Sequence, residues 1–514
     1  MNDPTACPDV AGWLDSGAAF GGVAPDRRID THAASVFLVG DRAWKLKRPV
    51  ALGYLDFSTP ERRRAALAAE LELNRRNAPQ LYRALHRVTR AADGTLALDG
   101  AGEAVDWLLE MRRFPDDALL DAVAARGGID DALLDALADH VVAMHAGAPV
   151  VRRGDGAAHL RAVVEGNAAS MARFPDQLPP EEAGALTRAT MAELDRQAGL
   201  LDARGRAGRV RHVHGDLHLA NIALIDGRPV AFDCLEFDAG LATTDVLYDL
   251  AFLLMDLWQR GLRAGANRLF NRYADRSPED EAGLGLLPVM MAVRATVRAH
   301  VLAAQASGGG AGAAGAGERA RGYLALARAL AEPVPPRLLA IGGLSGTGKT
   351  TLARALADGV GGAPGARIVR SDVVRKQLAG VAPETRLAAS AYTREASARV
   401  YDALGRRAGA GLASGVSVVA DAVFAAEDER AAIRAVAQER KARFDGVWLM
   451  LGEAGRVARV EARVGDASDA DAAVARMQTA RHPDAPGDWL CLDAGGPVAA
   501  LAERARRALA AAGG

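Results

Sequence analysis

The chain has 514 residues, more than a single hydrophobic core normally supports, so at least two domains are expected. Its 50% hydrophobic and 25% charged residues are typical of a globular protein, and a formal net charge of -1 argues against a broad basic surface for nucleic acid. The three scattered cysteines, Cys7, Cys234 and Cys491, exclude a disulfide framework or a zinc cluster and suit a reducing compartment.

No segment has the pattern of a leader or of a membrane span. The first five residues have neither a basic segment nor an apolar core. The most apolar stretch, residues 246–258, carries Asp249 and Asp256. We therefore predict a cytoplasmic protein without a membrane partner, and the oligomeric state stays open.

In chain order, the first predicted elements are two short strands. Residues 32–39 and 42–46 are joined by a Gly-Asp turn, and strand alternation places Lys45 and Lys47 on one face. Only five of the 63 Lys and Arg residues are lysines, so each lysine is expected to have a specific role. The pair either contacts phosphate or lies on a solvated strand face.

A helix is predicted over residues 60–76, with Glu70 on its apolar face. A carboxylate in this position can hold Lys45. Residues 106–111 form a further strand, and helical patterns dominate from Asp117 onward. A β-rich lobe therefore precedes a helical one.

The helical part contains a motif suited to phosphoryl transfer. His214-Gly-Asp216-Leu-His-Leu-Ala-Asn221 is followed by Asp233 at the end of an apolar strand. An aspartate, an asparagine five residues later and a second aspartate can supply one general base and two Mg²⁺ ligands. Transfer of a phosphoryl group to a hydroxyl needs such a set, because catalysis there is mostly positioning and charge neutralisation. A solvated turn without chemistry is the alternative.

Residues 30–330 resemble the aminoglycoside phosphotransferases and related protein-kinase-like small-molecule kinases, most specifically in the motif 214–221 and Asp233. The chain departs from that family in having no glycine-rich loop before Lys45. The resemblance implies a bilobal kinase fold that uses ATP and Mg²⁺. The roles that it implies are a catalytic base at Asp216, Mg²⁺ ligands at Asn221 and Asp233, phosphate positioning by Lys45 paired with Glu70, and cofactor binding at Met111.

A proline-rich connector divides the sequence. The glycine- and alanine-rich tract at 307–317 predicts a flexible loop, and Pro-Val-Pro-Pro at 333–336 predicts a stiff linker. We therefore predict a kinase-like domain over residues 1–332, with its small lobe ending near residue 112, and a second domain over 337–514.

The second domain opens with a phosphate-binding loop. Residues 343–350, Gly-Leu-Ser-Gly-Thr-Gly-Lys-Thr, match the P-loop pattern, with an apolar strand before them and a helix after them. Backbone N–H groups of such a loop surround phosphate oxygens at a helix N-terminus. The pattern predicts that Lys349 contacts the β- and γ-phosphates of ATP or GTP and that Thr350 binds Mg²⁺. The predicted nucleotide-binding residues are Gly343, Ser345, Gly346, Thr347, Gly348, Lys349, Thr350 and Thr351.

Strands and helices alternate after this loop, which predicts a parallel sheet flanked by helices. The predicted strands are 367–371, 416–420, 447–451 and 489–492. Substrates of such folds lie at the carboxyl ends of the strands. We therefore predict that Asp372 takes the acceptor proton, with the helix cap as the alternative role, and that Arg375 and Asp421 belong to the same site.

Arginines near residues 465–471 resemble those of a mobile lid that closes on the transferred phosphate. The predicted lid residues are Arg459 and Arg463, with Arg476 beyond. Asp469 and Asp471 are interpreted as the acidic first turn of a helix capped by Ser468. This half resembles the gluconate kinase, polynucleotide kinase and zeta-toxin group of P-loop kinases.

As a whole, the chain resembles bacterial fusions of these two kinds of domain, which are often labelled AAA family ATPases. The resemblance implies a Mg-ATP-dependent phosphotransferase with two nucleotide sites and small-molecule hydroxyl acceptors. Two alternatives stay open: a degenerate sensor domain joined to one active P-loop kinase, and a nucleic-acid end kinase. A motor ATPase is disfavoured because Asp421 is followed by Ala422 and not by a second acid.

Overall fold

The computed structural model describes residues 9–31, 33–52, 55–236, 238–308, 313–382, 385–462, 468–481 and 486–511. By its contacts the chain divides into two compact units. Unit 1 comprises Met1–Arg153 and Ala207–Asp249, and unit 2 comprises Gly154–Arg206 and Leu250–Gly514. The connector at 333–336 thus lies inside unit 2, and the domain boundary that we expect at this connector stays a prediction.

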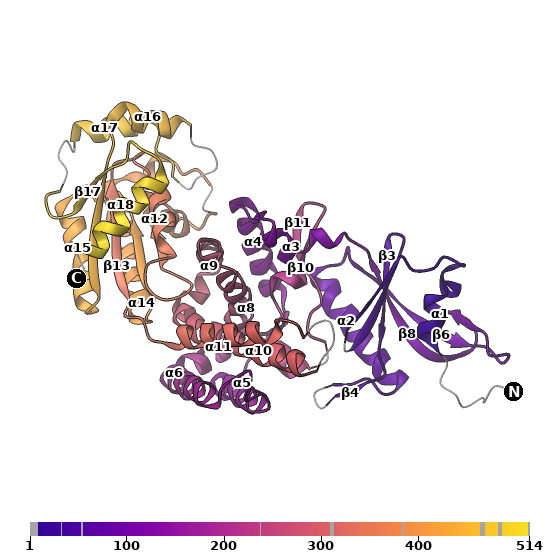
Figure 1. Cartoon of the computed structure of the whole chain (residues 1–514). Helices are drawn as coiled ribbons and strands as arrows, with labels where there is room; N and C mark the ends of the chain where they lie inside the picture. Colours follow the sequence, from indigo (N-terminus) through magenta and orange to yellow (C-terminus); the bar gives the residue numbers. More distant parts are fainter. Residues whose placement is uncertain are drawn as a thin grey trace. The chain divides into compact units, whose positions relative to one another are not determined.

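Unit 1 is built on a six-stranded antiparallel sheet with the strand order β1-β2-β3-β8-β6-β7 (Figure 1). Its strands are β1 (Arg27–Asp30), β2 (Ala34–Val39), β3 (Arg42–Lys47), β6 (Tyr82–Arg90), β7 (Leu96–Leu98) and β8 (Glu103–Arg112). Helix α2 (Pro60–Asn77) packs against β6 and β8. It begins as the sequence predicts, because the Thr59 hydroxyl accepts a hydrogen bond from the Arg62 N–H at 3.3 Å and Pro60 occupies the first turn.

The remaining elements of unit 1 are short, except for helix α4. The helices are α1 (Val10–Asp15), α3 (Leu120–Ala125), α4 (Asp131–Gly147) and α7 (Ala239–Ala242), and the strands are β4 (Ala51–Leu52), β5 (Leu55–Asp56), β9 (Val210–His212), β10 (Ile222–Ile225), β11 (Arg228–Ala231) and β12 (Thr243–Asp245). The hairpin β10–β11 and the antiparallel pair β9–β12 bracket the motif 214–221 and Asp233. They hold the predicted catalytic segments between short antiparallel ladders.

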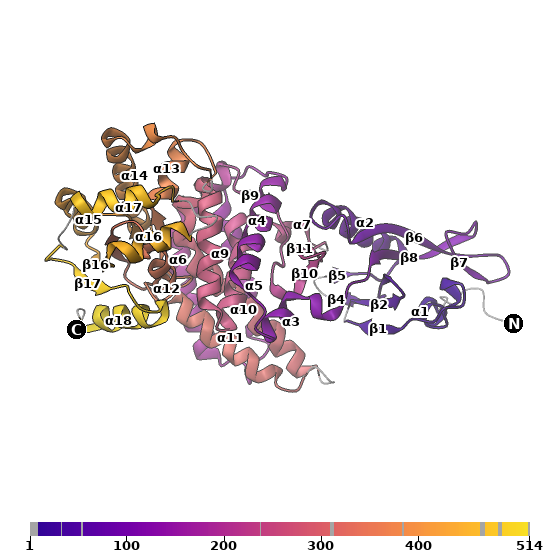
Figure 2. The ribbon, with the colours of Figure 1, turned by 90° about the horizontal axis from the view of Figure 1, so that it is seen from above.

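Unit 2 begins with helices. They are α5 (Gly156–Met171), α6 (Pro180–Arg206), α8 (Val246–Gln259), whose first turn belongs to unit 1, α9 (Arg263–Arg276), α10 (Leu287–Ser307) and α11 (Ala316–Ala331). Helices α10 and α11 lie side by side (Figures 1 and 2). The segment Pro278–Ser307 is long and apolar enough to cross a membrane, but 72% of its most apolar window is buried inside the protein. The stretch 246–258 that the sequence analysis singled out lies in α8, which has 14 residues and is shorter than this 30-residue segment.

The second part of unit 2 is a five-stranded parallel sheet with the order β14-β15-β13-β16-β17. Its strands are β13 (Arg337–Gly343), β14 (Arg367–Arg370), β15 (Val418–Asp421), β16 (Arg443–Met450) and β17 (Leu490–Asp493), and its helices are α12 (Lys349–Ala357), α13 (Ser371–Leu378), α14 (Arg394–Ala413), α15 (Glu427–Glu439), α16 (Glu453–Glu461), α17 (Ala472–Arg481) and α18 (Val498–Ala511). Side chains of α12 and α18 fill one face of the sheet, and those of α14 and α15 fill the other.

These findings confirm the predicted fold class, a mixed α/β chain in which a β-rich N-terminal lobe precedes helices and a helix-flanked parallel sheet carries the P-loop. One boundary matters for chemistry. Helix α13 starts at Ser371, so Asp372 lies within its first turn and is not the residue that caps it. The alternative role of Asp372 as a helix cap is therefore wrong.

A buried arginine joins the helical part of unit 2 to its sheet. Arg367, at the start of β14, has a side chain that is 2% exposed and pairs with Asp275 at 2.7 Å and Glu281 at 3.0 Å. Asn271 accepts hydrogen bonds from the Arg367 guanidinium at 3.3 Å and from the Ile368 N–H at 2.7 Å. The edge strand that leads to Asp372 is thus bonded directly to α9 and the turn that follows it.

Candidate functional site

The predicted pair of Lys45 and Glu70 is present in unit 1. Lys45 Nζ, on β3, lies 2.6 Å from Glu70 Oε1 on α2 and 2.8 Å from Asp233 Oδ1, which follows β11. Glu70 is fully buried, whereas the Asp233 side chain is 43% exposed. A buried helix carboxylate therefore fixes the lysine, and the lysine in turn meets a carboxylate that solvent can reach.

The electrostatics of the contact between Lys45 and Asp233 favour the charged forms of both groups. Burial alone would raise the pKa of Asp233, but the Lys45 charge and hydrogen bond outweigh it and hold that pKa below its ordinary value. Burial would lower the pKa of Lys45, but Asp233 and Glu70 keep it well above its ordinary value. Asp233 is therefore an ionised oxygen donor, the kind of ligand that Mg²⁺ prefers.

The predicted base, Asp216, lies in the turn before β10. Its Oδ2 accepts a hydrogen bond from Asn221 Nδ2 at 2.9 Å, and His218 Nε2 is 3.4 Å away. Buried Asp249 stabilises the turn, because its carboxylate accepts hydrogen bonds from the Gly215 N–H at 2.8 Å and the His214 N–H at 3.3 Å. Asp216 is partly exposed and held by Asn221, as a base that meets a substrate hydroxyl requires.

Met111 lies near the end of β8, opposite Ala43 and Tyr82 in the sheet register. It is half-buried and packs against the cluster that contains Leu67 and Leu109. It is an apolar surface on the strand next to Lys45, and its role in binding the nucleotide stays a prediction.

The P-loop of unit 2 joins β13 to α12. Gly343, Gly346 and Gly348 have φ values of 138°, 86° and 94°, in the region that side chains disfavour. A Cβ at Gly346 would lie 2.4 Å from the Arg456 carbonyl oxygen, so only glycine fits there. Lys349 Nζ donates to the Leu344 carbonyl at 3.2 Å. The loop is thus folded as its glycine spacing predicts.

The remaining predicted loop residues frame the same turn. Thr347 is 1% exposed, and its hydroxyl donates to the Leu344 carbonyl at 2.8 Å. Thr350, in the first turn of α12, donates its hydroxyl to Asp421 Oδ2 at 2.5 Å. Thr351 lines a small cavity beside the loop. Asp421, which we expected to act in catalysis, therefore sits against the predicted Mg²⁺ ligand, at the end of β15.

Asp372 is surrounded by charged groups. Burial raises the pKa of Asp372, and the negative charge of Asp421 raises it further. The positive charges of Arg370 and Lys349 and a hydrogen bond from Ser468 lower it. The net effect is a pKa above the ordinary value for aspartate. Arg370, which the sequence analysis did not single out, also lies 3.6 Å from Asp421 and is the arginine that faces both carboxylates.

Arg375 contacts the segment that follows α13, and its role at the P-loop site stays a prediction. Its guanidinium donates to the Ala391 carbonyl at 2.6 Å and stacks on the Tyr392 ring, 4.7 Å from the centroid. Arg375 lies one helical turn after Asp372, as predicted, and its side chain packs on the ring of Tyr392.

The interpretation of Asp469 as part of a helix first turn is wrong. Helix α17 begins at Ala472, and Asp471 caps it by accepting from the Val474 N–H at 2.9 Å. Asp469 instead pairs with Lys376, whose side chain is 1% exposed. It also accepts a hydrogen bond from the Leu387 N–H at 2.9 Å. This aspartate connects the end of the predicted lid segment to α13.

Arg459 contacts the P-loop backbone. Its Nη1 donates to the Thr347 carbonyl at 3.1 Å and its Nη2 to the Ala494 carbonyl at 2.7 Å. Together with Thr351 and Val498 it lines a cavity of about 180 Å³. Arg463 lies outside the described residues. Arg459 therefore borders a pocket next to the loop, where a nucleotide base could lie.

Two residues that sequence reasoning missed hold the peptide of Ser345. Arg456, 1% exposed, donates to its carbonyl at 3.2 Å, and Gln478 accepts from its N–H at 2.7 Å. Helices α16 and α17 thus each contribute one hydrogen bond to the backbone of the P-loop. Spacing gave no signal for Arg456, because it is one of many arginines and its partners are backbone atoms far away in the sequence.

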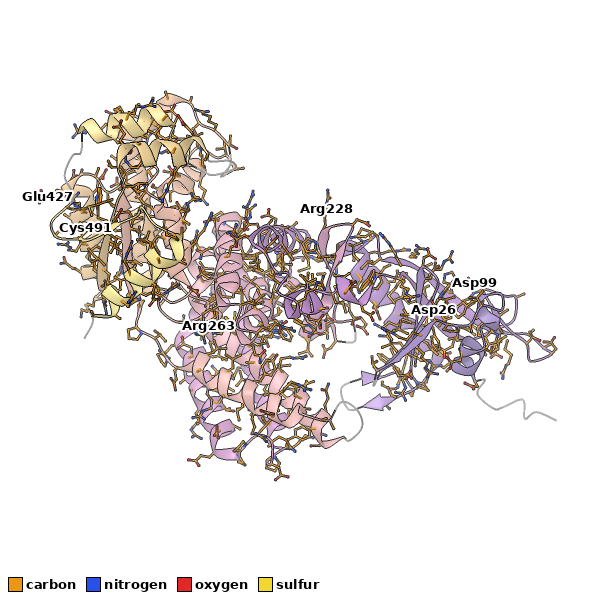
Figure 3. All side chains as sticks on the ribbon, turned by 45° about the horizontal axis from the view of Figure 1, so that its top comes forward. Asp26, Asp99, Arg228, Arg263, Glu427 and Cys491 are labelled. Carbon is orange, nitrogen blue, oxygen red and sulfur yellow. The ribbon has the colours of Figure 1, made fainter. Side chains whose placement is uncertain are left out.

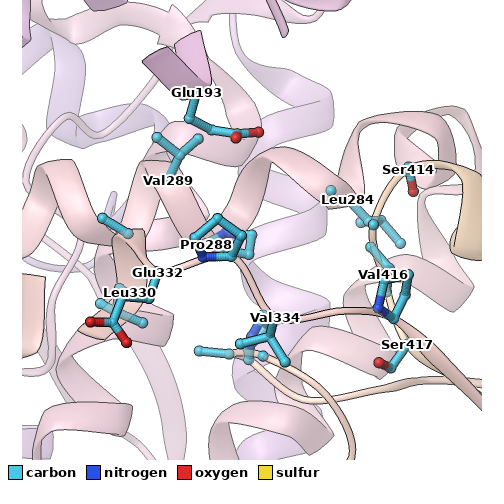
Figure 4. Close-up of a pocket in the computed structure, with 18 of the residues that line it drawn as sticks. Glu193, Leu284, Pro288, Val289, Leu330, Glu332, Val334, Ser414, Val416 and Ser417 are labelled. Atoms are coloured by element: carbon cyan, nitrogen blue, oxygen red, sulfur yellow. The ribbon is translucent and has the colours of Figure 1, made fainter. Parts of the chain in front are cut away.

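A larger cavity, of about 580 Å³, lies at the other end of the parallel strands (Figure 4). Its wall includes Val334 just before β13, Pro364 shortly before β14 and Val416 just before β15. None of the predicted site residues lines it. The two cysteines that the structure describes, Cys234 in unit 1 and Cys491 on β17 (Figure 3), are both free thiols.

Residues 338–484 match the model of a protein family described as an AAA domain. The chain is 32% identical over 418 residues to an uncharacterized protein of Mycobacterium tuberculosis (strain ATCC 25618 / H37Rv), and to one of Mycobacterium bovis (strain ATCC BAA-935 / AF2122/97). In both cases the match covers 80% of this chain and 80% of the relative.

Two solved kinase structures are also similar. A gluconokinase from Sinorhizobium meliloti 1021 matches 35% of this chain and 94% of its own, with 22% identity and a TM-score of 0.26. The amicoumacin kinase hAmiN matches 62% of this chain and 93% of its own, with 16% identity and a TM-score of 0.39. At these scores neither structure says anything about the substrate of this chain. The sequence identity over most of both proteins does establish a family: the chain belongs to the family of the two mycobacterial proteins.

Proposed function

We propose that this protein is an ATP-dependent phosphotransferase with two nucleotide sites, one in unit 1 and one at the P-loop of unit 2, each transferring a γ-phosphate to a hydroxyl of a small molecule. The observation that carries the two-site proposal is the contact of Lys45 with both Glu70 and Asp233. A lysine that can bind phosphate thus lies next to a carboxylate that can bind a metal ion. Unit 1 has this combination without a P-loop. The free thiols agree with a cytoplasmic location.

In unit 1, we assign each residue one task. Lys45 neutralises phosphate oxygens, and Glu70 holds its ammonium in place. Asn221 and Asp233 offer the oxygen atoms that would hold Mg²⁺, which supplies charge neutralisation between the phosphates when bound. The hydroxyl oxygen of the acceptor bonds to the γ-phosphorus while the bond from that phosphorus to the ADP oxygen breaks. Asp216 accepts the proton of the hydroxyl in this step.

In unit 2, Lys349 and the P-loop N–H groups hold the phosphates. Thr350 and Asp421 present two oxygen donors within 2.5 Å of each other, which fits a Mg²⁺ site better than a catalytic role for Asp421. The cavity bordered by Arg459 is where we place the nucleotide base. Asp372 follows β14, which is separated from β13 by β15 in the sheet, and it is the proposed proton acceptor.

We expect two molecules of a non-hydrolysable ATP analogue to bind per chain in the presence of Mg²⁺. Calorimetry on the intact chain measures the stoichiometry, and Lys349→Ala and Asp233→Asn should each remove one of the two binding events. The test uses point variants because a cut near residue 332 would pass through unit 2 and separate elements that are bonded to each other. If only one nucleotide binds per chain and Asp233→Asn does not change its binding, unit 1 does not bind nucleotide.

Asp372→Asn should abolish acceptor phosphorylation at the P-loop site while the variant still binds ATP. Loss of a general base typically costs about 10²–10⁴ in rate. An ordinary aspartate has a pKa of about 3.9. Because the pKa of Asp372 is higher, the rate of the wild-type protein should begin to fall at a higher pH during acidification. The pH–rate profile of each protein, with Asp402→Asn on the surface of α14 as control, measures both effects. A variant with a normal rate and an unchanged acid limb would contradict the assignment.

A further inference from the structure

Four consecutive residues that begin at the predicted metal ligand are each tied to another part of unit 1. The Asp233 N–H donates to Tyr82 Oη at 3.1 Å, the Cys234 N–H to Asn74 Oδ1 at 3.0 Å and the Leu235 N–H to the His214 carbonyl at 2.9 Å. The fourth residue, Glu236, is held by its side chain, which accepts a hydrogen bond from Lys47 Nζ. The segment 233–236 is therefore fixed along its whole length.

The two ends of this segment share one network with β3. Lys47 Nζ also lies 2.9 Å from Glu70 Oε2, while the other oxygen of Glu70 meets Lys45. The contacts form a closed ring that runs Asp233, Lys45, Glu70, Lys47, Glu236 and back along the chain to Asp233. The side chains of Lys47, Glu70 and Glu236 are 3%, 0% and 9% exposed. The expected alternative of a solvated lysine face is therefore wrong.

Burial separates the roles of the two lysines. Lys45 is adjacent to the exposed carboxylate of Asp233, so it can meet a ligand. Lys47 is enclosed by two carboxylates and lies 5.2 Å from the Phe57 ring centroid, so it cannot reach one without leaving its site. Its charge is used entirely inside the protein.

We infer that Lys47 and Glu236 are positioning residues that hold Asp233 in the conformation in which it binds the metal of the nucleotide. This inference rests on the proposed nucleotide site of unit 1. Asp233 has a φ of 62°, in the left-handed region that non-glycine residues seldom occupy. Such a conformation persists only where the surrounding contacts enforce it. The bond between Lys47 and Glu236 supplies that constraint from the far end of the segment.

Substitutions that leave the net charge unchanged, or that remove a negative charge, separate positioning from charge. The ring holds three carboxylates and two ammonium groups, and the Mg²⁺–nucleotide complex is a net anion, so the loss of Lys47 alone would weaken its binding by charge as well. The loss of Glu236 alone would strengthen binding by charge, and the loss of both Lys47 and Glu236 would leave the net charge unchanged. If the two residues act by positioning, binding weakens in all three cases.

The test is hydrogen exchange of the intact protein, followed in peptides that cover residues 230–240, during titration with a non-hydrolysable ATP analogue at saturating Mg²⁺. This readout reports unit 1 locally, although the P-loop can bind the same nucleotide. Lys47→Met should shift the midpoint of protection at least 10-fold to higher concentration. Glu236→Gln, which keeps an acceptor for Lys47, should shift it less, and Arg42→Met, an exposed position on the same strand, should not shift it.

A stability control separates folding from positioning. In Lys47→Met/Glu236→Leu an apolar pair replaces the buried ion pair, a change that often restores stability. The melting temperature should recover while the midpoint stays weak. A midpoint that recovers with stability, or that is unchanged or tighter in Lys47→Met, would overturn the inference and leave the proposed function standing. Wild-type peptides that show no protection at any nucleotide concentration would overturn both.

Discussion

Asp216→Asn is expected to lower phosphotransfer at the unit 1 site by roughly 10²–10⁴-fold, because asparagine cannot accept the proton of the acceptor hydroxyl. The substitution should leave the local fold intact, since the hydrogen bond with Asn221 Nδ2 at 2.9 Å needs only an oxygen at this position. Nucleotide binding should also persist, because Lys45, Glu70 and Asp233 are unchanged. The loss should therefore appear in kcat with little change in the affinity for ATP.

The measurement is ATP consumption against a panel of sugars, nucleosides, aminoglycosides and oligonucleotides. Each Asp216 variant is compared with its parent in a Lys349→Ala background, so that the P-loop site does not contribute. Asp226→Asn is the matched control, because Asp226 is an exposed carboxylate in the neighbouring β10–β11 turn that pairs with Arg112 at the surface. If Asp216→Asn leaves every rate unchanged, unit 1 is not a catalyst and the sensor alternative gains support.

Features encoded by short local patterns could be predicted from the sequence. The P-loop is one, because its glycines must adopt left-handed or otherwise restricted backbone angles at fixed spacing, and Gly343, Gly346 and Gly348 do so. The pairing of Lys45 with Glu70 is another, because strand and helix periodicity each place one residue on the inner face. The roles of these residues in catalysis stay predictions.

Features that depend on distant contacts could not be predicted. Nothing in the spacing showed that Asp469 pairs with Lys376 or that Arg456 holds the carbonyl of Ser345, since these contacts join residues about a hundred positions apart. Arginine made this harder, because the chain uses it for nearly every positive charge, so a buried structural arginine looks like a surface one. The scarce lysines carried more information, and four of the five, Lys45, Lys47, Lys349 and Lys376, take part in the specific contacts described above.

The division of the chain shows the same limit. The proline connector at 333–336 predicted a boundary, yet α9 and its following turn are bonded to β14 through Arg367 and Asn271. Asn267 adds hydrogen bonds to the Pro364 and Ala366 carbonyls, each at 3.0 Å. A linker composition describes the stiffness of the connecting chain, but it carries no information about whether the elements on its two sides pack together.

Arg367→Met is expected to destabilise the whole of unit 2, both its helices and its sheet, by about 3–5 kcal/mol. The substitution leaves the carboxylates of Asp275 and Glu281, 23% and 19% exposed, without their buried cation. Burial opposes the charge on Arg367, but Glu281 and Asp275 outweigh it and raise its pKa above the ordinary value, so the charge is present at every accessible pH. The cost is therefore that of an unpaired buried charge cluster, much larger than that of a surface ion pair.

Urea unfolding measures this effect, with fluorescence from single-tryptophan variants that retain Trp258 in α8 or Trp448 in β16. Both probes should shift to lower urea by the same amount, because the arginine joins the two parts. Arg161→Met is the matched control: its side chain is 37% exposed and pairs with Asp195, which is 60% exposed, so the loss should stay within about 1 kcal/mol. A shift seen only by Trp448 would mean that the sheet unfolds by itself and that the proline connector is a true domain boundary. That outcome would also restore the cut near residue 332 as a way to isolate the P-loop kinase.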